Sequence, residues 1–179
     1  MSESLSFAII STQRSWGGGE EQARQLAGGL RQRGHKCLIV AVGGCPFAER
    51  MESDGFPIVG LSSGGPAPWR IVQLRRMLHR ARAQAVYFND ARAVTLGGLA
   101  AWRLAGAVTV AARRTAFPLR SPARYQWLCD RLFCVSRYAA ELCAQAGFPR
   151  DRLAVVHDGV DPDRVKSGDR GRGRATLGL

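Results

Sequence analysis

The sequence lacks the features by which membrane-spanning and secreted proteins are usually identified. It has no run of 18 apolar residues that could span a bilayer. The start Met1-Ser2-Glu3-Ser4 has no basic region of the kind that opens a signal peptide. These absences predict a cytoplasmic protein. Peripheral attachment to the inner face of the membrane stays open, because it needs surface charge rather than a spanning helix.

Cysteine and histidine are few, and neither has the spacing of metal ligands. The five cysteines stand at positions 37, 45, 129, 134 and 143, an odd number without a C-x-x-C pair. This pattern favours reduced thiols over a disulfide framework or a zinc site. The three histidines, His35, His79 and His157, are equally unsuited to hold a metal together. We therefore expect neither a metal nor a bound cofactor.

Lysine is nearly absent, although the chain is strongly basic. Of 26 basic residues only Lys36 and Lys166 are lysine, and with 14 acidic residues the net charge is +12. The arginines are spread along the chain without a helix-turn-helix, zinc-finger or RNP signature, so we expect no nucleic-acid partner. A coding bias towards arginine explains the excess as well as a function does. The functional alternative is attraction to phosphorylated ligands or to an anionic membrane surface.

One predicted helix concentrates this positive charge. Apolar residues recur at helical spacing from Trp69 onwards, and five arginines accompany them: Arg70, Arg75, Arg76, Arg80 and Arg82. A solvated basic face is the simpler interpretation. The alternative is salt-sensitive binding to anionic lipid.

Strand-like and helix-like patterns alternate along the 179 residues. About seven short apolar runs predict strands, at 7–10, 36–42, 56–61, 85–88, 108–112, 132–135 and 153–156. The alternation implies an α/β fold, a doubly wound Rossmann-like parallel sheet with helices on both faces. We expect residues 1–165 to form this domain around the first strand, and residues 166–179 to be a basic, glycine-rich linker. The predicted core contains Ile9, Leu26, Leu38, Val40, Val86, Leu99, Val110 and Val135.

The turn after the first strand is the strongest local signal for a binding site. Gly17, Gly18 and Gly19 separate that strand from a helix with apolar residues at positions 23, 26, 27 and 30. Glycine lets the backbone approach a ligand, and the N–H groups of a helix start favour an anion. We predict that Gly17, Gly18 and Arg14 bind phosphate. A tight structural turn is the alternative. Neither G-x-G-x-x-G nor a P-loop is present, which argues against those nucleotide folds.

Several ordered motifs resemble the N-terminal domain of family 4 (group 1) glycosyltransferases, which have the GT-B fold. Residues 17–20, GGGE, look like the family's G-G-x-E loop, and residues 26–35 match its L-A-x-x-L-x-x-R-G-H run. Residues 130–136, DRLFCVS, resemble its D-x-(apolar)-x-x-V-S strand. The G-F-P at 147–149 and H-D-G-V-D at 157–161 resemble its G-[VF]-P … N-G-V-D ending. The resemblance spans nearly the whole chain.

The resemblance implies a metal-independent, retaining glycosyltransferase that moves a sugar from a nucleotide sugar, its co-substrate, to a glycan or lipid-linked acceptor. Bacterial surface polysaccharide biosynthesis is the pathway expected for such a domain. It further implies that residues 1–165 are the acceptor-side half, that 166–179 lead to a missing C-terminal nucleotide-binding domain, and that this fragment alone is inactive. The alternative is a non-catalytic module that binds a sugar or a nucleotide phosphate.

The ends of the fourth and fifth strands depart from the family pattern. Many members place a histidine after the fourth strand, where this chain has Asn89 and Asp90, and another after the fifth, where it has Arg114. Asparagine can hydrogen-bond a sugar hydroxyl but cannot exchange a proton near neutral pH. Because ligands of open α/β folds bind at the carboxyl ends of strands, we predict Asn89 and Asp90 as catalytic residues and Arg113 and Arg114 as acceptor-side, cleft-lining residues. A simple strand-end turn is the alternative for Asn89-Asp90.

Overall fold

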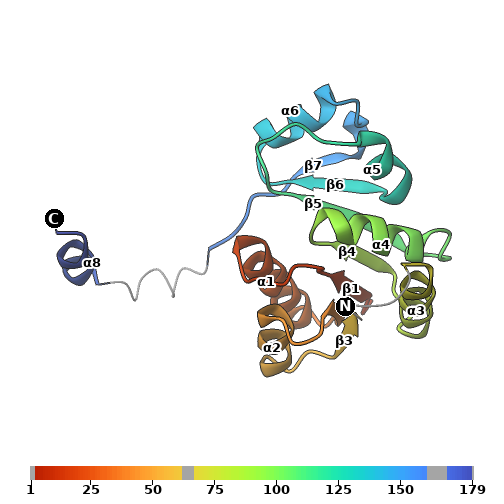
Figure 1. Cartoon of the computed structure of the whole chain (residues 1–179), viewed down its shortest axis with the longest axis horizontal. Helices are drawn as coiled ribbons and strands as arrows, with labels where there is room; N and C mark the ends of the chain where they lie inside the picture. Colours follow the sequence, from red (N-terminus) through yellow and green to blue (C-terminus); the bar gives the residue numbers. More distant parts are fainter. Residues whose placement is uncertain (1–2, 62–66, 161–168, 179) are drawn as a thin grey trace.

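The computed structural model describes residues 3–61, 67–160 and 169–178, and it contains one parallel sheet flanked by helices (Figure 1). The strands are β1 Ser6–Ile10, β2 Lys36–Val42, β3 Ile58–Leu61, β4 Ala85–Phe88, β5 Val108–Arg113, β6 Arg131–Cys134 and β7 Leu153–Val155. The helices are α1 Gly18–Gln32, α2 Pro46–Ser53, α3 Ala67–Arg80, α4 Ala91–Ala101, α5 Pro122–Leu128, α6 Arg137–Gln145 and α8 Arg170–Leu177, with a 3-10 turn at Arg150–Arg152.

The sheet has the order β3-β2-β1-β4-β5-β6-β7, and each neighbouring pair is parallel. The chain first winds from β1 towards β3 and then returns past β1 to wind from β4 towards β7. Because parallel crossovers are right-handed, the two directions place their helices on opposite faces. The predicted doubly wound fold with β1 near its centre is therefore confirmed.

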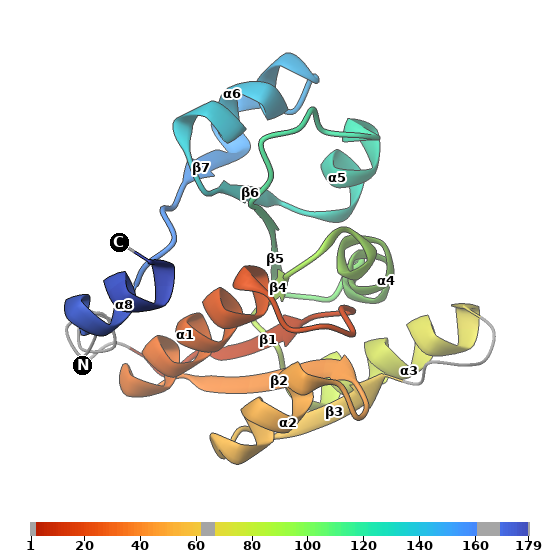
Figure 2. The same cartoon turned by 60° about the vertical axis from the view of Figure 1, so that its left-hand side comes forward.

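Each face of the sheet has its own hydrophobic core. Helices α1 and α2 pack on one face around Ile9, Ile39, Phe47 and Met51. Buried residues of α3, α4, α5 and α6 share the core of the other face. Figure 2 shows α1 and α2 on one side of the strands and α3, α4 and α5 on the other. A ligand-binding crevice is expected between β1 and β4, where the winding direction reverses.

The predicted core is confirmed for Ile9, Val40 and Val86, which are fully buried. Four other predicted core residues are partly buried: Leu38, Leu99, Val110 and Val135. The prediction is wrong for Leu26, whose side chain is 36% exposed. Helix α1 packs through the small side chains of Ala23 and Ala27, and Leu26 lies beside them in a groove of about 270 Å³ that also contacts β4, β5 and β6.

Aspartate side chains cap two of the helices. Helix α4 begins at Ala91, because Asp90 accepts from the backbone N–H groups of Arg92 and Ala93. Within the expected linker 166–179, Asp169 caps the helix α8 in the same way. None of the α8 residues is buried, and Figure 1 shows α8 apart from the sheet. Residues 166–168 lie outside the described ranges.

Gly98 allows α4 to pack directly against α5. A Cβ at this position would lie 2.6 Å from Leu128 Cβ and 2.8 Å from the Leu128 carbonyl oxygen. We expect Gly98→Ala to lower the free energy of unfolding by about 1–2 kcal/mol, since overpacking costs about 1–3 kcal/mol and the helix propensity of alanine offsets up to about 1. Urea denaturation measures the change. Gly28→Ala, where a Cβ meets nothing within 4 Å, is the control and should not destabilise. Equal effects of the two substitutions would contradict this packing.

Candidate functional site

The candidate site lies at the carboxyl ends of β1, β4 and β5, where the sheet changes winding direction. Ile10, at the end of β1, is paired with Phe88 of β4, and Phe88 is paired with Ala111 of β5. The residues that follow these strands therefore meet at one edge of the sheet. They include Ser11 and Thr12 after β1, and Asn89 and Asp90 after β4.

A buried chain of polar side chains crosses this edge. Glu20, from the first turn of α1, accepts hydrogen bonds from Asn89 Nδ2 at 3.0 Å and from Ser11 Oγ at 3.3 Å. The other end of the Asn89 amide, Oδ1, accepts from Arg114 Nη1 at 2.9 Å. Glu20 and Asn89 are each only 6% exposed. We call Glu20, Asn89 and Arg114 the polar chain; it links α1 to the ends of β4 and β5.

Arg114 extends this arrangement to two further residues. Its Nη2 donates to the Tyr87 hydroxyl at 2.7 Å, and its Nε lies 3.6 Å from Asp158 Oδ1. Burial raises the pKa of Tyr87 above its usual value, and the neighbouring guanidinium of Arg114 opposes that rise. The tyrosine therefore stays protonated at neutral pH, and Arg114 carries the positive charge of this edge, partly balanced by Asp158.

Asp90 has hydrogen bonds on both carboxylate oxygens. Its Oδ1 accepts from Thr12 Oγ1 at 2.6 Å and from the N–H groups of Arg92 and Ala93 at 2.9 and 3.0 Å, while Oδ2 accepts from Thr12 N at 2.6 Å. The carboxylate thus caps α4 and ties the end of β1 to it. The structure gives this predicted catalytic residue a role in holding the fold.

The glycine turn lies against the polar chain. Gly17 precedes the first turn of α1, and as a glycine it has no side chain with which to cap the helix. A Cβ at Gly19 would lie 3.4 Å from Arg114 Nη1 and 3.8 Å from Asn89 Nδ2, whereas a Cβ at Gly18 would meet nothing within 4 Å. Gly19 therefore lies next to Asn89 and Arg114, while the space at Gly18, one of the two predicted phosphate-binding glycines, is open.

Two predicted site residues lie elsewhere. Arg113 is the last residue of β5 and Arg114 follows it, and the guanidinium of Arg113 donates to the carbonyl oxygens of Phe117 and Pro118 in the following loop. Arg14 lines a cavity of about 520 Å³ between α3 and α4. No hydrogen bond joins its guanidinium to the glycine turn among the residues described by the structure. The predicted grouping of Arg14 with Gly17 and of Arg113 with Arg114 is therefore not seen as direct contact.

Sequence reasoning did not select Glu20, Tyr87 or Asp158 as site residues. Glu20 had a signal, because it is the acidic position of the GGGE turn, yet a first-turn acid is also what the helix dipole favours on a solvated surface. Tyr87 lies inside the predicted strand 85–88, where nothing in the sequence marks it as a site residue. Asp158 belongs to the H-D-G-V-D motif at 157–161, far along the chain from the other site residues. Among the residues in the described ranges, no three His, Cys, Asp or Glu side chains gather as metal ligands would.

The fold matches that of several solved structures over one half of their length. The structure of Anabaena Alr3699/HepE in complex with UDP-glucose aligns with a TM-score of 0.77 at 16% identity, over 96% of this chain and 49% of that one. A glycosyltransferase from Rickettsia africae ESF-5 aligns with a TM-score of 0.79 at 14% identity, over 98% and 49%. Acinetobacter baumannii MurG gives 0.66 at 18%, over 87% and 46%. The chain thus spans about half the length of these proteins.

These matches define the fold as one Rossmann-like half of a GT-B glycosyltransferase. A family model described as Glycosyltransferase Family 4 matches residues 16–164, more than half of the chain. The chain therefore belongs to glycosyltransferase family 4, and the match begins after β1, just before the glycine turn. A comparison with curated proteins finds no match.

Removing the Arg114 charge should alter the titration of Tyr87. Arg114→Gln takes a cation away from a hydroxyl that already lies near Asp158, so the phenolate becomes less favourable and the pKa of Tyr87 should rise further. An ultraviolet absorbance titration measures this, with Tyr87→Phe identifying the contribution of that residue. Arg113→Gln is the matched control and should leave the Tyr87 titration unchanged. A lowered or constant pKa in Arg114→Gln would contradict the contact.

Proposed function

We propose that this chain is the acceptor-side domain of a retaining, metal-independent glycosyltransferase, which moves a sugar from a nucleotide sugar to a glycan or lipid-linked acceptor. The observation that carries the proposal is the open start of α1 at the switch point of the sheet, where a Cβ at Gly18 would meet nothing within 4 Å and the adjacent Gly19 lies against Asn89 and Arg114. The Anabaena structure with UDP-glucose and the same fold supports a nucleotide-sugar donor. Bacterial surface polysaccharide assembly is the pathway that we propose.

The residues of this chain suit stabilisation of a leaving diphosphate. The N–H groups in the first turn of α1 and its dipole favour an anion at the glycine turn. Arg114 adds a positive charge that Asn89 and Tyr87 hold in place. Preorganised donors of this kind stabilise the charge that develops as the sugar leaves. The Asn89 amide nitrogen donates to Glu20 and its oxygen accepts from Arg114, so we assign Asn89 the role of positioning the arginine.

A non-catalytic binding module is the second candidate, since the N–H groups of the glycine turn favour an anion whether or not transfer follows. The chain spans about half the length of the Anabaena and Rickettsia proteins described above. Transfer in a two-domain cleft needs groups from both walls, held in register. We therefore expect residues 1–179 alone to show no transfer, and a protein that also carries the proposed nucleotide-binding domain to be active. Ligand binding without transfer in that longer protein would favour the module.

Gly18→Val tests the proposed donor side of the site. A Cβ at Gly18 has open space within the fold, so the substitution should leave the melting temperature nearly unchanged. The valine would occupy the space that the donor phosphates need, and transfer by the two-domain protein should fall about a hundredfold. Initial rates with nucleotide sugars measure the effect, and residues 1–179 alone serve as the inactive control. Full activity of Gly18→Val, or its unfolding, would show that the glycine turn has a structural role only and would contradict the proposed binding of the donor phosphates there.

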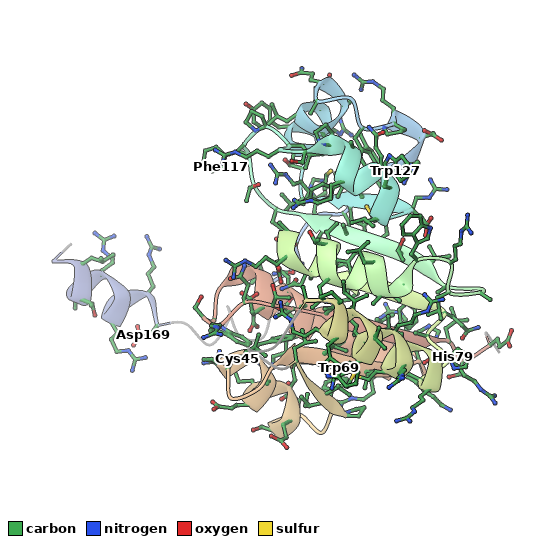
Figure 3. The ribbon with its side chains drawn as sticks, turned by 45° about the vertical axis from the view of Figure 1, so that its right-hand side comes forward. Cys45, Trp69, His79, Phe117, Trp127 and Asp169 are labelled. Atoms are coloured by element: carbon green, nitrogen blue, oxygen red, sulfur yellow. The ribbon has the colours of Figure 1, made fainter. Side chains whose placement is uncertain are left out.

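We further propose a cytoplasmic location with peripheral attachment to the inner face of an anionic membrane. Among the described residues, no helix combines the length and apolar character that a membrane crossing requires. Arg75 of α3 donates to the carbonyl oxygens of Ala100 and Trp102, which ties it to the end of α4. Arg76, Arg80 and Arg82 are exposed and remain available for lipid headgroups. Figure 3 shows α3 at the surface, with Trp69 and His79 near its two ends.

Vesicle sedimentation tests this attachment. The chain should bind vesicles that contain phosphatidylglycerol and should detach as salt is raised, because each basic residue near such a surface contributes about 1 kcal/mol. Arg76→Gln with Arg80→Gln should weaken binding by about tenfold or more, and Glu52→Gln, a distant change of similar size, should not weaken it. Equal binding to neutral phosphatidylcholine vesicles would refute the charge argument.

A further inference from the structure

A second cavity lies next to the candidate site, between α3 and α4. It has a volume of about 520 Å³ and lies at the carboxyl ends of β2 and β3, where Val42 and Leu61 line it. Its walls come from the first turns of α3 and from α4, which lie side by side in Figures 1 and 3. This size suits a ligand of tens of atoms rather than a single ion.

The charged residues that line the cavity are basic. Among the described residues, the lining contains four arginines, Arg14, Arg70, Arg92 and Arg124, and no acidic residue. The Nε atoms of Arg70 and Arg124 are buried and have no hydrogen-bond partner in the part of the chain that the structure describes. Because these Nε atoms are closed off from solvent, a ligand would meet the charge of the guanidinium groups and not these atoms, and a bound anion would balance that partly buried charge. Guanidinium groups match phosphate oxygens in particular, because their N–H groups point in pairs.

Apart from Thr12 and Thr95, the remaining lining of the cavity is apolar. Ile71 of α3 faces the space together with Leu96 and Leu99 of α4 and Leu61 of β3. A free phosphate or nucleotide diphosphate would leave this wall in contact with water, whereas a neutral glycan would leave the arginines unpaired. A molecule that joins a phosphate to an apolar chain satisfies both parts of the lining.

Thr12 and Asp90 link the wall of the cavity to the candidate site. Thr12 lines the cavity, and its backbone N–H and hydroxyl both donate to Asp90 at 2.6 Å. Asp90 directly follows Asn89 of the polar chain. A ligand with its phosphate among the arginines would therefore lie against the loop that leads from β1 to the glycine turn, of which Thr12 and Arg14 line the cavity. Such a position suits an acceptor that meets a donor held at the glycine turn.

We propose that the cavity between α3 and α4 binds the acceptor through a phosphate or diphosphate that is linked to an apolar chain. The acceptor is thus a lipid-linked phosphate rather than a neutral glycan. The name acceptor rests on the proposed function, but the binding chemistry rests only on the arginines and the apolar wall. The four arginines hold the phosphate, and Ile71, Leu96 and Leu99 cover the first part of the chain.

Calorimetric titration of residues 1–179 with farnesyl diphosphate, below its aggregation concentration, tests the inference. We expect farnesyl diphosphate to bind at least about tenfold more tightly than inorganic diphosphate or farnesol. Arg70→Gln and Arg124→Gln should each weaken binding by about tenfold to a hundredfold, the range of one charged hydrogen bond. Arg80→Gln, on the same helix but outside the cavity, is the matched control and should bind as the unchanged chain does. Because Arg70 has an unpartnered buried atom, Arg70→Gln should keep the melting temperature.

The outcomes separate the possible sources of binding. Equal affinity for inorganic diphosphate would show an anion site without a chain-binding wall, and equal affinity for farnesol would remove the role of the arginines; either result overturns the inference. Equal losses in Arg70→Gln and Arg80→Gln, with competition by phosphatidylglycerol vesicles, would assign the binding to the membrane surface and overturn it too.

Binding as expected, together with no sugar transfer by the two-domain protein, would contradict the proposed function and leave the cavity assignment standing. Transfer to neutral acceptors alone would support the function and overturn the inference.

Discussion

The carboxylate of Asp90 holds together the edge of the sheet on which the candidate site depends. It accepts two hydrogen bonds from Thr12 after β1 and two from the first turn of α4. One side chain therefore fixes both the loop that leads to the glycine turn and the start of the helix that walls the cavity. Charge-assisted hydrogen bonds of this kind are stronger than neutral ones, so this junction is well suited to keep its geometry when ligands bind.

The arginines on the two sides of Asp90 differ in their hydrogen-bond partners. Arg114 is surrounded by partners, namely Asn89, Tyr87 and the nearby carboxylate of Asp158. Between α3 and α4, the buried Nε atoms of Arg70 and Arg124 have no hydrogen-bond partner among the described residues. A paired arginine is held in one orientation, whereas an unpaired buried one favours an anionic ligand. This contrast is why we assign Arg114 to a preformed site and the cavity to a ligand that brings its own charge.

Local patterns predicted the strands, the glycine turn and the family, because each rests on short-range spacing: apolar runs for strands and ordered motifs for the family. They failed for Leu26, because helical periodicity shows which residues share a face but not how far the neighbouring sheet extends beneath it. The contact of Glu20 with Asn89 joins residues 69 positions apart and depends on the pairing of β1 with β4. The cavity between α3 and α4 could not be predicted from local patterns either, since its lining comes from several loops and helices.

The two adjacent glycines of α4 also decide where the specificity of this protein can change. A Cβ at Gly97 would lie 2.6 Å from Phe88 Cε1 and 2.8 Å from Ile10 Cδ1, and Gly98 is as close to Leu128. Helix α4 thus has no room to shift towards the sheet or towards α5. Relatives that accept larger or differently charged molecules should therefore differ along the first turns of α3, and directed evolution for new acceptors should begin with the side chains of Arg70 and Ile71.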